Sequence, residues 1–439
     1  ERFNEEVVIF NSKQSDRLNL LSWQKVKNGE VKIAVGTRMA VFLPFNNLGL
    51  IIVDSENNPS YKEEQRPYYH ARVVSFMHAD LTKAELILSD ISPSLESMYL
   101  VKQKKIDYLL LKKDYFPSIV LIDIKKQSPL VIKKIGLTYP FQEILKESLR
   151  NKKRVLIFLN RKGFSTFIYC PRCRKILKCP RCDVNLVYYF KEKKLTCHYC
   201  NYKCLPPKIC PDCNSSYIRY TGIGIEKLES KLSWLYPEAK ISKLEKNQNF
   251  LSIDLDFIIS TDIIFRKTLP DIDTIGVVSL DNVLNRIDFR ASERAFYTLL
   301  KLLVLNPNRI ILQTELPGHY CFKALLEKDI SLFYEAELNL RKELQLPPFR
   351  KLVLIKLRGK QRQRVKDKTK VLFKKLINTD RDKSIKVISY FANSPEKLRD
   401  NYIWQIMLSS KSTQKLIRFL KKVLKKFKPS GIIINVEID

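Results

Sequence analysis

The sequence predicts an α/β protein that carries an inserted metal-binding module and a C-terminal α+β domain. Three observations lead to this prediction. Short apolar runs alternate with helical stretches over most of the chain, nine of the ten cysteines lie between Cys170 and Cys213, and the order of elements changes at residue 351. With 439 residues, the chain is long enough for two to four domains of about 100–150 residues each.

Apolar runs rich in β-branched residues mark the predicted strands of the α/β part. They do not alternate with polar residues, which is typical of parallel strands buried on both faces. Helical stretches at 140–150 and 290–304 separate several of them, so we expect one mostly parallel sheet or two. The predicted strands lie at 33–35, 48–54, 84–90, 154–160, 256–261, 274–280 and 309–314.

The C-terminal region shows a different order of elements. A strand at 351–357 is followed by a helix at 364–377, strands at 385–391 and 402–408, a helix at 412–428 and a strand at 432–438. This β-α-β-β-α-β order predicts a ferredoxin-like α+β domain. In the second helix, an apolar stripe at helical spacing predicts the core face, and lysines fill the remaining positions as a solvated or phosphate-binding face. The stripe is Leu416, Ile417, Leu420, Val423, Leu424 and Phe427, and the lysines are Lys421, Lys422, Lys425, Lys426 and Lys428.

The charge of the chain favours a polyanionic partner. Lys and Arg number 79 against 46 Asp and Glu, which gives a net charge of +33 and indicates DNA or RNA. A compositional bias towards Lys, Ile and Asn is the alternative explanation. No apolar run approaches the roughly 18 residues of a membrane span, so we expect no membrane partner. Because the chain starts at Glu1 without a leader, we expect a cytoplasmic protein cut from a longer sequence.

The clustered cysteines predict two zinc ions. They form four Cys-x-x-Cys pairs, and two such pairs complete a tetrahedral four-cysteine site that suits Zn²⁺ and is structural rather than catalytic. In a reducing cytoplasm, this pattern favours metal ligation over disulfides. Residues 183–196 look like two strands joined by a turn, which would bring the second and third pairs together. The predicted ligands are Cys179, Cys182, Cys197 and Cys200 for one ion, and Cys170, Cys173, Cys210 and Cys213 for the other.

Two alternatives to this assignment remain open. The pairs can instead combine in sequential order, the first with the second and the third with the fourth. Iron–sulfur ligation is the other possibility. We expect His198, Cys204 and Cys321 not to be ligands, because they lie outside the pair pattern.

Several blocks of sequence in a fixed order resemble the PriA family of replication-restart DNA helicases. The cysteine pairs follow VLIFLNRKGFS at 155–165 and precede YTGIGIEKLESKL at 220–232. Further blocks lie at 31–74, 288–300, 343–360 and 394–408. The resemblance implies RecA-like helicase lobes, of which the first is incomplete. The implied domains are 1–125 for the remainder of lobe 1, 126–168 and 215–345 for lobe 2, 169–214 for the inserted zinc module, and 346–439 for the ferredoxin-like domain.

The same resemblance implies partners and cofactors. It implies branched or fork-like DNA, primosome and replication-restart proteins as partners, and ATP and Mg²⁺ as family cofactors; we expect a monomer. An active ATP-dependent 3′–5′ helicase is one alternative, if an upstream segment supplies the phosphate-binding P-loop that these residues lack. A zinc-ribbon RNA-binding protein is another, although it leaves the helicase-like blocks unexplained.

The helicase motifs that the resemblance identifies are eroded. The family's DEEH box reads DSEN at 54–57, so that Asp54 and Glu56 are vestigial and Ser55 replaces the carboxylate that activates the attacking water. The stretches STDIIFRKTLP at 260–270 and KLLVLNPN at 301–308 replace a glycine-containing motif and an arginine-finger motif. We therefore expect no intact catalytic residues and impaired ATP hydrolysis.

Aromatic side chains interleaved with cations follow the DSEN box. Such a segment can stack on bases and neutralise phosphates, or else pack on the surface of the lobe. The same two alternatives apply to two arginines in DFRASER at 288–294. The predicted nucleic-acid-binding residues are Tyr61, Lys62, Arg66, Tyr68, Arg72, Arg290 and Arg294.

Overall fold

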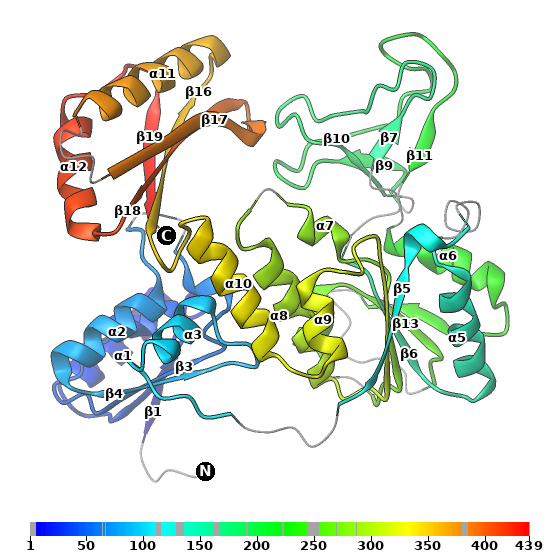
Figure 1. Cartoon of the computed structure of the whole chain (residues 1–439), viewed down its shortest axis with the longest axis horizontal. Helices are drawn as coiled ribbons and strands as arrows, with labels where there is room; N and C mark the ends of the chain where they lie inside the picture. The colour runs from blue at the N-terminus through cyan, green and yellow to red at the C-terminus, as the bar shows by residue number, and fades with distance from the viewer. Residues whose placement is uncertain are drawn as a thin grey trace. The chain divides into compact units, whose positions relative to one another are not determined.

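The computed structural model describes residues 6–63, 65, 67–110, 116–128, 136–160, 167–189, 192–221, 224–244, 254–268, 270–286, 288–379 and 385–438. The chain divides into two compact units, Glu1–Asp107 and Tyr108–Asp439. Figure 1 labels the helices and strands. Within these ranges, no helix combines the length and the apolar character that a membrane span needs.

The first unit contains two pairs of parallel strands. β1 (Val7–Phe10) pairs with β2 (Ile33–Gly36), and β3 (Leu50–Asp54) pairs with β4 (Glu85–Ser89). Parallel strands need a crossover, which α1 (Asp16–Lys27) and α2 (Ala71–Thr82) supply; α3 (Leu95–Lys102) follows β4. Short 3-10 turns, η1 (Arg38–Phe42) and η2 (Pro59–Tyr61), lie in the connections. The parallel strands predicted at 33–35, 48–54 and 84–90 are confirmed, although they belong to two separate sheets. Their predicted burial on both faces is wrong, because Val53 is the one buried residue of β2, β3 and β4.

The second unit is built on a six-stranded parallel sheet with the order β12-β13-β6-β14-β15-β5. The strands predicted at 154–160, 256–261, 274–280 and 309–314 are confirmed. Every residue of β6, β13 and β14 is buried, which explains why their sequences do not alternate. The strands are β5 (Ser118–Asp123), β6 (Val155–Phe158), β12 (Ile241–Lys243), β13 (Phe257–Ser260), β14 (Thr274–Val277) and β15 (Arg309–Thr314).

β5 corrects one predicted domain boundary. The range 1–125 placed this segment in the first lobe, but β5 pairs with β15 from Ser118↔Arg309 to Asp123↔Thr314. The division between the compact units falls at Asp107, well before β5. Because the partner strand lies far along the chain, the local sequence carries no sign of this pairing.

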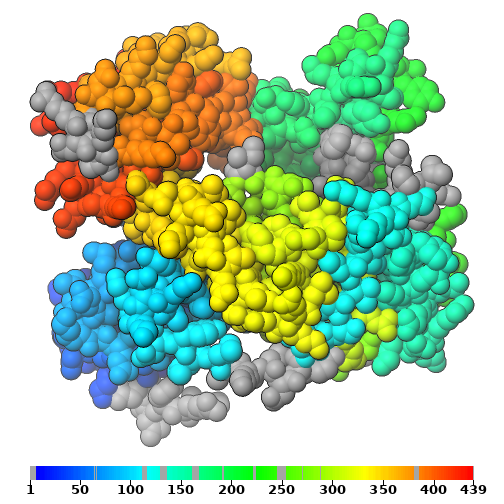
Figure 2. All heavy atoms as spheres, viewed as in Figure 1, coloured from blue at the N-terminus to red at the C-terminus, as the bar shows by residue number. Residues whose placement is uncertain are grey.

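Helices cover both faces of the six-stranded sheet (Figure 1). One face carries α5 (Tyr139–Arg150) and α6 (Ile225–Leu235), and the other carries α8 (Ala291–Val304) and α9 (Tyr320–Leu326). The short α7 (Asp281–Leu284) precedes α8, and α10 (Ser331–Glu343) packs against α9. Figure 2 shows α10 forming part of the outer surface of this unit. The connections also include two 3-10 turns, η3 (Ile124–Lys126) and η4 (Asp262–Arg266).

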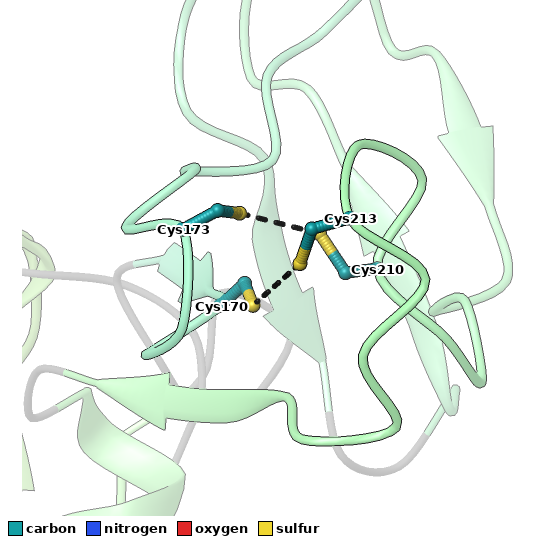
Figure 3. Close-up of side chains that lie close together, drawn as sticks. All are labelled: Cys170, Cys173, Cys210 and Cys213. Carbon is teal, nitrogen blue, oxygen red and sulfur yellow. Dashed lines mark hydrogen bonds between the residues drawn. The ribbon is translucent and has the colours of Figure 1, made fainter.

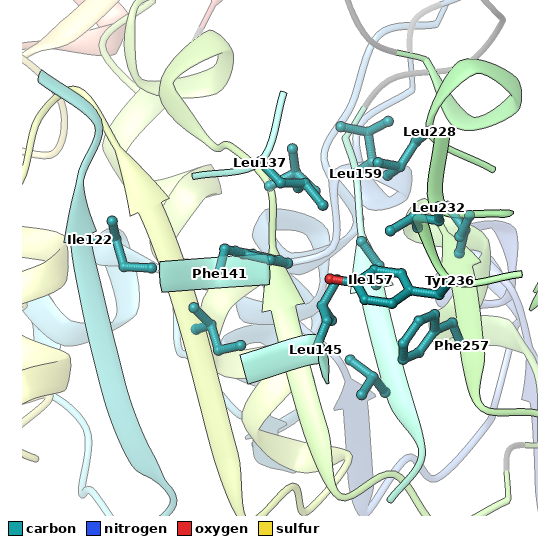
Figure 4. Packing of buried hydrophobic residues seen from close by; sticks show 14 residues of the cluster. Ile122, Leu137, Phe141, Leu145, Ile157, Leu159, Leu228, Leu232, Tyr236 and Phe257 are labelled. Atoms are coloured by element: carbon teal, nitrogen blue, oxygen red, sulfur yellow. The ribbon is translucent and has the colours of Figure 1, made fainter. Parts of the chain in front are cut away.

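The core beneath α5 and α6 explains why one strand carries a glycine. The ring of Phe141 lies fully buried against β14 (Figure 4). A Cβ atom at Gly276 would lie 2.4 Å from that ring, so only glycine permits this close approach. Nearby, the hydroxyl of the buried Tyr236 donates to the Gln142 carbonyl at 2.9 Å, which satisfies this polar group.

The C-terminal domain has the predicted ferredoxin-like fold. Its antiparallel sheet has the order β17-β18-β16-β19, and two helices pack on one face around a shared core. In the second helix, Leu416, Leu420 and Val423 are buried as predicted, whereas Ile417 is 37% exposed and lies at the edge of the stripe. The elements are β16 (Lys351–Gly359), α11 (Arg362–Thr379), β17 (Ile385–Leu398), β18 (Asn401–Ser410), α12 (Thr413–Lys425) and β19 (Ile433–Ile438).

The zinc module begins and ends on a pair of strands. β7 (Phe167–Tyr169) pairs antiparallel with β11 (Arg219–Thr221), so the module spans slightly more than the predicted 169–214. Inside it, β8 (Val187–Tyr189), β9 (Lys194–Thr196) and β10 (Lys203–Cys204) form a three-stranded antiparallel sheet. The predicted pair of strands within 183–196 is therefore present, and it joins the second and third cysteine pairs.

Candidate metal centres

Each of the four Cys-x-x-Cys pairs closes with the same backbone turn. The residue after the second cysteine has a positive φ: 59° at Arg174, 49° at Asp183, 59° at Asn201 and 54° at Asn214. The amide of the first cysteine donates to the carbonyl five residues later, for example at 2.9 Å from Cys170 to Lys175. Asn and Asp tolerate the left-handed conformation better than most residues, which suits three of these four positions. The repeated turn directs both thiols of a pair to the same side.

The eight thiols meet in two clusters. Cys170, Cys173, Cys210 and Cys213 form the first cluster, and Cys179, Cys182, Cys197 and Cys200 form the second, with the sulfur atoms of each within 4.8 Å of one another. Figure 3 shows the four side chains of the first cluster pointing towards a common centre. The pairs are thus interleaved, the first with the fourth and the second with the third. The sequential pairing is contradicted.

The spacing of the sulfur atoms fits zinc. Tetrahedral Zn–S bonds of about 2.3 Å place neighbouring sulfurs about 3.8 Å apart. The observed separations are 3.6 Å for Cys170–Cys213, Cys173–Cys210 and Cys179–Cys200, far longer than a disulfide bond. Four thiols that converge on one point suit a single ion, whereas a multi-iron cluster would distribute the four sulfurs over two or four irons. The two four-cysteine clusters are therefore consistent with two zinc ions, each in a closed structural site.

The two clusters differ in their surroundings. In the first, Cys173 is exposed; in the second, Cys179, Cys182 and Cys197 are all buried. The second cluster is also part of a small apolar core with Ile168, Leu186, Tyr188 and Leu195. We expect the second ion to be the better protected of the two.

The remaining cysteines and His198 are not members of the two four-sulfur groups. Cys204 is on β10 and pairs with Leu195 across the sheet. His198 Nε2 lies 2.9 Å from the Tyr189 hydroxyl. Cys321 is buried in α9, where burial raises the pKa of its thiol well above the usual value. None of these three belongs to a four-sulfur group in the described residues.

The vestigial carboxylates of the DSEN box have different environments. Asp54 is exposed at the end of β3, and the next residue, Ser55, has a φ of 54°. Glu56 is buried: its Oε2 lies 2.5 Å from Arg72 Nη1, and its Oε1 accepts from the Ser94 amide at 2.6 Å. Glu96 also contacts Arg72, at 3.3 Å. Glu56 thus organises the loop beneath α2, and Arg72 belongs to that ion-pair network rather than to an open surface.

The aromatic segment after the DSEN box is a loop that hydrogen bonds and a β-bridge hold in place. The Tyr61 hydroxyl donates to the Asp54 carbonyl at 2.6 Å, and Lys62 forms a β-bridge with His70. Arg38 donates to the Ser60 carbonyl at 3.0 Å. Tyr68 stands out because its side chain is 39% exposed. Arg66 lies outside the described residues.

The two arginines at 288–294 take part in ion pairs. Arg294 lies 2.6 Å from Asp288, and Arg290 lies 3.2 Å from Glu293. Glu293 also pairs at 3.1 Å with Arg341, a fully buried residue of α10. Arg290 is therefore connected to a buried network, and Arg294 is the more exposed of the two, with a 42% exposed side chain.

Sequence reasoning missed two arrangements that depend on distant residues. The eroded stretches at 260–270 and 301–308 meet where Lys301 Nζ lies 4.3 Å from the centre of the Phe265 ring. The tip of the β17–β18 hairpin contacts the second cysteine cluster. Neither contact has a sequence motif of its own, so no local signal pointed to it.

Comparisons with known proteins agree with these features. A family model described as the PriA DNA helicase Cys-rich region (CRR) domain matches residues 179–204, which contain the second cluster. A model of the Primosomal protein N C-terminal domain matches residues 342–439, the ferredoxin-like domain.

Whole-chain similarity extends beyond these domains. The chain is 32% identical to the Replication restart protein PriA of Borreliella burgdorferi over 99% of its length and 68% of that protein. It is 30% identical to the Synechocystis protein of the same name, covering all of this chain and 56% of that protein. The corresponding values for the Bacillus subtilis protein are 28%, 100% and 57%. The chain belongs to the Replication restart protein PriA family.

Proposed function

We propose that this chain is a DNA-binding protein of replication restart, from a helicase family, whose ATP hydrolysis is impaired. The single observation that supports DNA binding in replication restart most strongly is the similarity over 99% of the chain to the Borreliella burgdorferi protein. The net charge of +33 suits a polyanionic partner. Fork-like or branched DNA is the proposed substrate, primosome and restart proteins are the proposed partners, and the proposed state is a cytoplasmic monomer.

Tyr68 is the proposed stacking residue of the DNA interface. Arg38 holds the loop that carries it, through the Ser60 carbonyl and through Glu63, whose Oε2 lies 2.7 Å from Arg38 Nη2. A tied loop with an exposed ring loses little conformational entropy when a base stacks on it. The Tyr61 hydroxyl donates to the Asp54 carbonyl, so the proposed role of Tyr61 is to position the loop. Lys62 beside it adds a positive charge.

α12 supplies a second proposed contact surface, for phosphates. Its apolar side faces the core, while five lysines of this helix and the turn after it are exposed. Lysine side chains of this kind contact the nucleic-acid backbone without reading sequence. They are Lys421, Lys422, Lys425, Lys426 and Lys428.

The groups around the DSEN box support the proposal of impaired hydrolysis. Phosphoryl transfer to water needs a positioned base or a water-orienting group, and a serine hydroxyl is too weak a base at neutral pH. Ser55 occupies that position, with its Oγ 3.5 Å from Asp54 Oδ2. The neighbouring carboxylate of Glu56 is held by Arg72 and the Ser94 amide, which removes it as a substitute.

The packing of Lys301 in the second lobe also supports impaired ATP hydrolysis. Lys301, in the stretch that replaces the arginine-finger motif, lies over the rings of Phe265 and Tyr297, at 4.3 and 5.1 Å. A lysine held between aromatic rings lacks the planar fork with which an arginine contacts a phosphate in two places. This packing therefore supports a structural use of the stretch instead of a catalytic one.

The test combines DNA binding with ATP turnover. Fork-shaped DNA is titrated between 50 and 200 mM salt, where a protein with roughly six phosphate contacts loses about 10³ in affinity. ATP turnover is then measured at saturating fork DNA, and we expect none above background. A flat salt dependence would contradict the DNA-binding proposal, whereas DNA-stimulated turnover would contradict only the impaired ATPase.

A further inference from the structure

The β17–β18 hairpin of the C-terminal domain ends in a strained two-residue turn. Leu398 pairs with Asn401, and the two residues between them, Arg399 and Asp400, have φ values of 49° and 63°. Two positive φ values define a type I′ turn, which favours Asn and Gly. A long side chain such as Arg399 is uncommon there and costs free energy, so surrounding contacts have to hold it.

Backbone amides of this turn point at one cysteine pair of the second cluster. The Arg399 amide donates to Cys182 Sγ at 3.3 Å. The next amide, that of Asp400, donates to the Arg181 carbonyl at 2.8 Å. Amide donors stabilise the negative charge of a metal-bound thiolate, so Cys182 receives a charge-assisted hydrogen bond from another domain.

Side chains of the hairpin extend the contact to both cysteine pairs of the cluster. Lys397 Nζ donates at 2.7 Å to the carbonyl of Pro180, the residue after Cys179. Arg399 Nε donates to the Tyr199 carbonyl at 3.0 Å, next to Cys200. Leu398 packs against the apolar core that surrounds the cluster. The hairpin tip thus supplies the donors, and the two cysteine pairs supply the acceptors.

The tip is fixed to the body of its own domain. Glu396 accepts from Arg362 at the start of α11 at 2.8 and 2.9 Å, and from Trp404 Nε1 at 3.0 Å. Trp404 packs against the core of the domain, so Glu396 links the tip to that core. A contact made by the tip is therefore connected to the body of the domain.

The first cluster has a different arrangement. The amides that point at Cys170 come from its own turn, at Arg172 and Cys173, and Cys173 is exposed. In the described ranges, no residue of the C-terminal domain donates a hydrogen bond to a thiol of this cluster. Among the residues that the structure describes, it is therefore the second metal site that has a contact able to couple it to the C-terminal domain.

We propose that the hairpin tip at 397–400 locks the second zinc site. Zinc holds the two cysteine pairs in the shape that accepts the tip, and the tip in turn slows the loss of that zinc. Because such coupling is reciprocal, removing either partner weakens the other. The first zinc exchanges independently of the C-terminal domain. Zinc at the second site thus makes the module and the ferredoxin-like domain one body.

The first experiment follows zinc release from the full chain to a chromophoric chelator, 4-(2-pyridylazo)resorcinol. We expect two phases of one zinc each, the slow phase from the second site. Leu398→Asp places a carboxylate beside the thiolates without altering a ligand. It should accelerate the slow phase by about 10- to 100-fold, the usual effect of removing an outer contact to a metal site, and leave the fast phase unchanged.

The matched control is Ile388→Asp, which makes the same change of side-chain charge at a 41% exposed position of the same strand. Both phases should keep their wild-type rates in this variant. An unchanged slow phase in Leu398→Asp, or equal acceleration of both phases, would overturn the proposal.

The second experiment tests the coupling in the opposite direction, from the metal site to the hairpin tip. Hydrogen exchange of the peptide at 396–403 is compared between Cys200→Ser, which impairs the second site, and Cys173→Ser, which impairs the first. Protection of the tip amides should be lost only in Cys200→Ser. Retained protection there, or equal loss in both variants, would contradict the coupling. If Cys200→Ser does not fold, the release kinetics of Leu398→Asp still decide, because that variant keeps all eight ligands.

Discussion

Arg72 and Glu56 form a buried ion pair in which Nη1 lies 2.5 Å from Oε2, with side chains only 8% and 1% exposed. Glu56 follows the end of β3 and Arg72 lies in the first turn of α2, so the pair fastens the helix to the strand. This one contact explains why neither side chain is available for the role expected from the sequence. It gives Arg72 a buried carboxylate partner in place of a phosphate, and it occupies the carboxylate of Glu56, the residue that follows Ser55.

We expect Arg72→Met to destabilise the first unit by about 3–5 kcal/mol, because it leaves the Glu56 carboxylate buried and unpaired. Adding Glu56→Gln should recover much of this loss, since a neutral amide still accepts from the Ser94 amide. Hydrogen exchange of β3 measures the change for this unit alone. Arg17→Met on exposed α1 is the matched control, and an equal effect there would refute the importance of the pair.

Metal analysis of protein purified without added zinc should find two zinc ions per chain. Cys173→Ser and Cys200→Ser should each lower the ratio towards one, because a three-sulfur site holds zinc more weakly. A ratio near one in the unaltered chain, or an iron–sulfur absorption band, would be inconsistent with the assignment.

Tyr68→Ala should weaken binding to a fork with a single-stranded arm by about 1–3 kcal/mol, the usual contribution of one stacked base. The slope of affinity against salt should not change, because no phosphate contact is removed. Tyr139→Ala, at a 62% exposed ring on α5, is the control and should bind normally. A loss of equal size in both variants would show that Tyr68 has no specific role.

Joining an intact family P-loop segment upstream and adding Ser55→Glu should not restore ATP turnover. Groups that act together in a transition state are not additive, and the substitutions at 260–270 and 301–308 remain. Turnover is measured with and without fork DNA. DNA-stimulated hydrolysis by this chimaera would show that the second lobe is competent.

His319 predicts a pH-dependent stability of the second unit. Burial lowers the pKa of His319 below its ordinary 6.5, and its Nδ1 accepts from the Cys321 amide at the start of α9, at 3.2 Å. The unfolded chain therefore binds this proton more readily, so the stabilisation is full above pH 6.5 and is lost as the pH falls below it.

His319→Asn keeps a side-chain acceptor at this position and cannot titrate. The difference in hydrogen exchange of α9 between pH 7.5 and 5.5 should therefore shrink in this variant. Other titrating groups contribute equally to both proteins and cancel in the comparison. An unchanged pH dependence in the variant would exclude His319 as the cause.

The sequence by itself determined the features that depend on short-range patterns. The spacing within each cysteine pair, the strand-turn-strand at 183–196 and the β-α-β-β-α-β order are all local, and the structure contains each of them. Uninterrupted apolar runs likewise predicted parallel strands, because burial on both faces removes the need for alternation. The prediction of two zinc ions needed only these patterns and the chemistry of thiolates.

Only the tertiary structure decided which distant groups meet. It paired β5 with β15 and buried Glu56 in an ion pair with Arg72. It also left Tyr68 exposed while the Tyr61 hydroxyl bonds to Asp54, and it brought the Arg399 amide to Cys182 Sγ. In each case the partner lies too far away in sequence, or on too irregular a loop, for a periodic pattern to reveal it. Ion pairs and amide donors act over a few ångströms, so the fold must first bring their atoms together before their chemistry is defined.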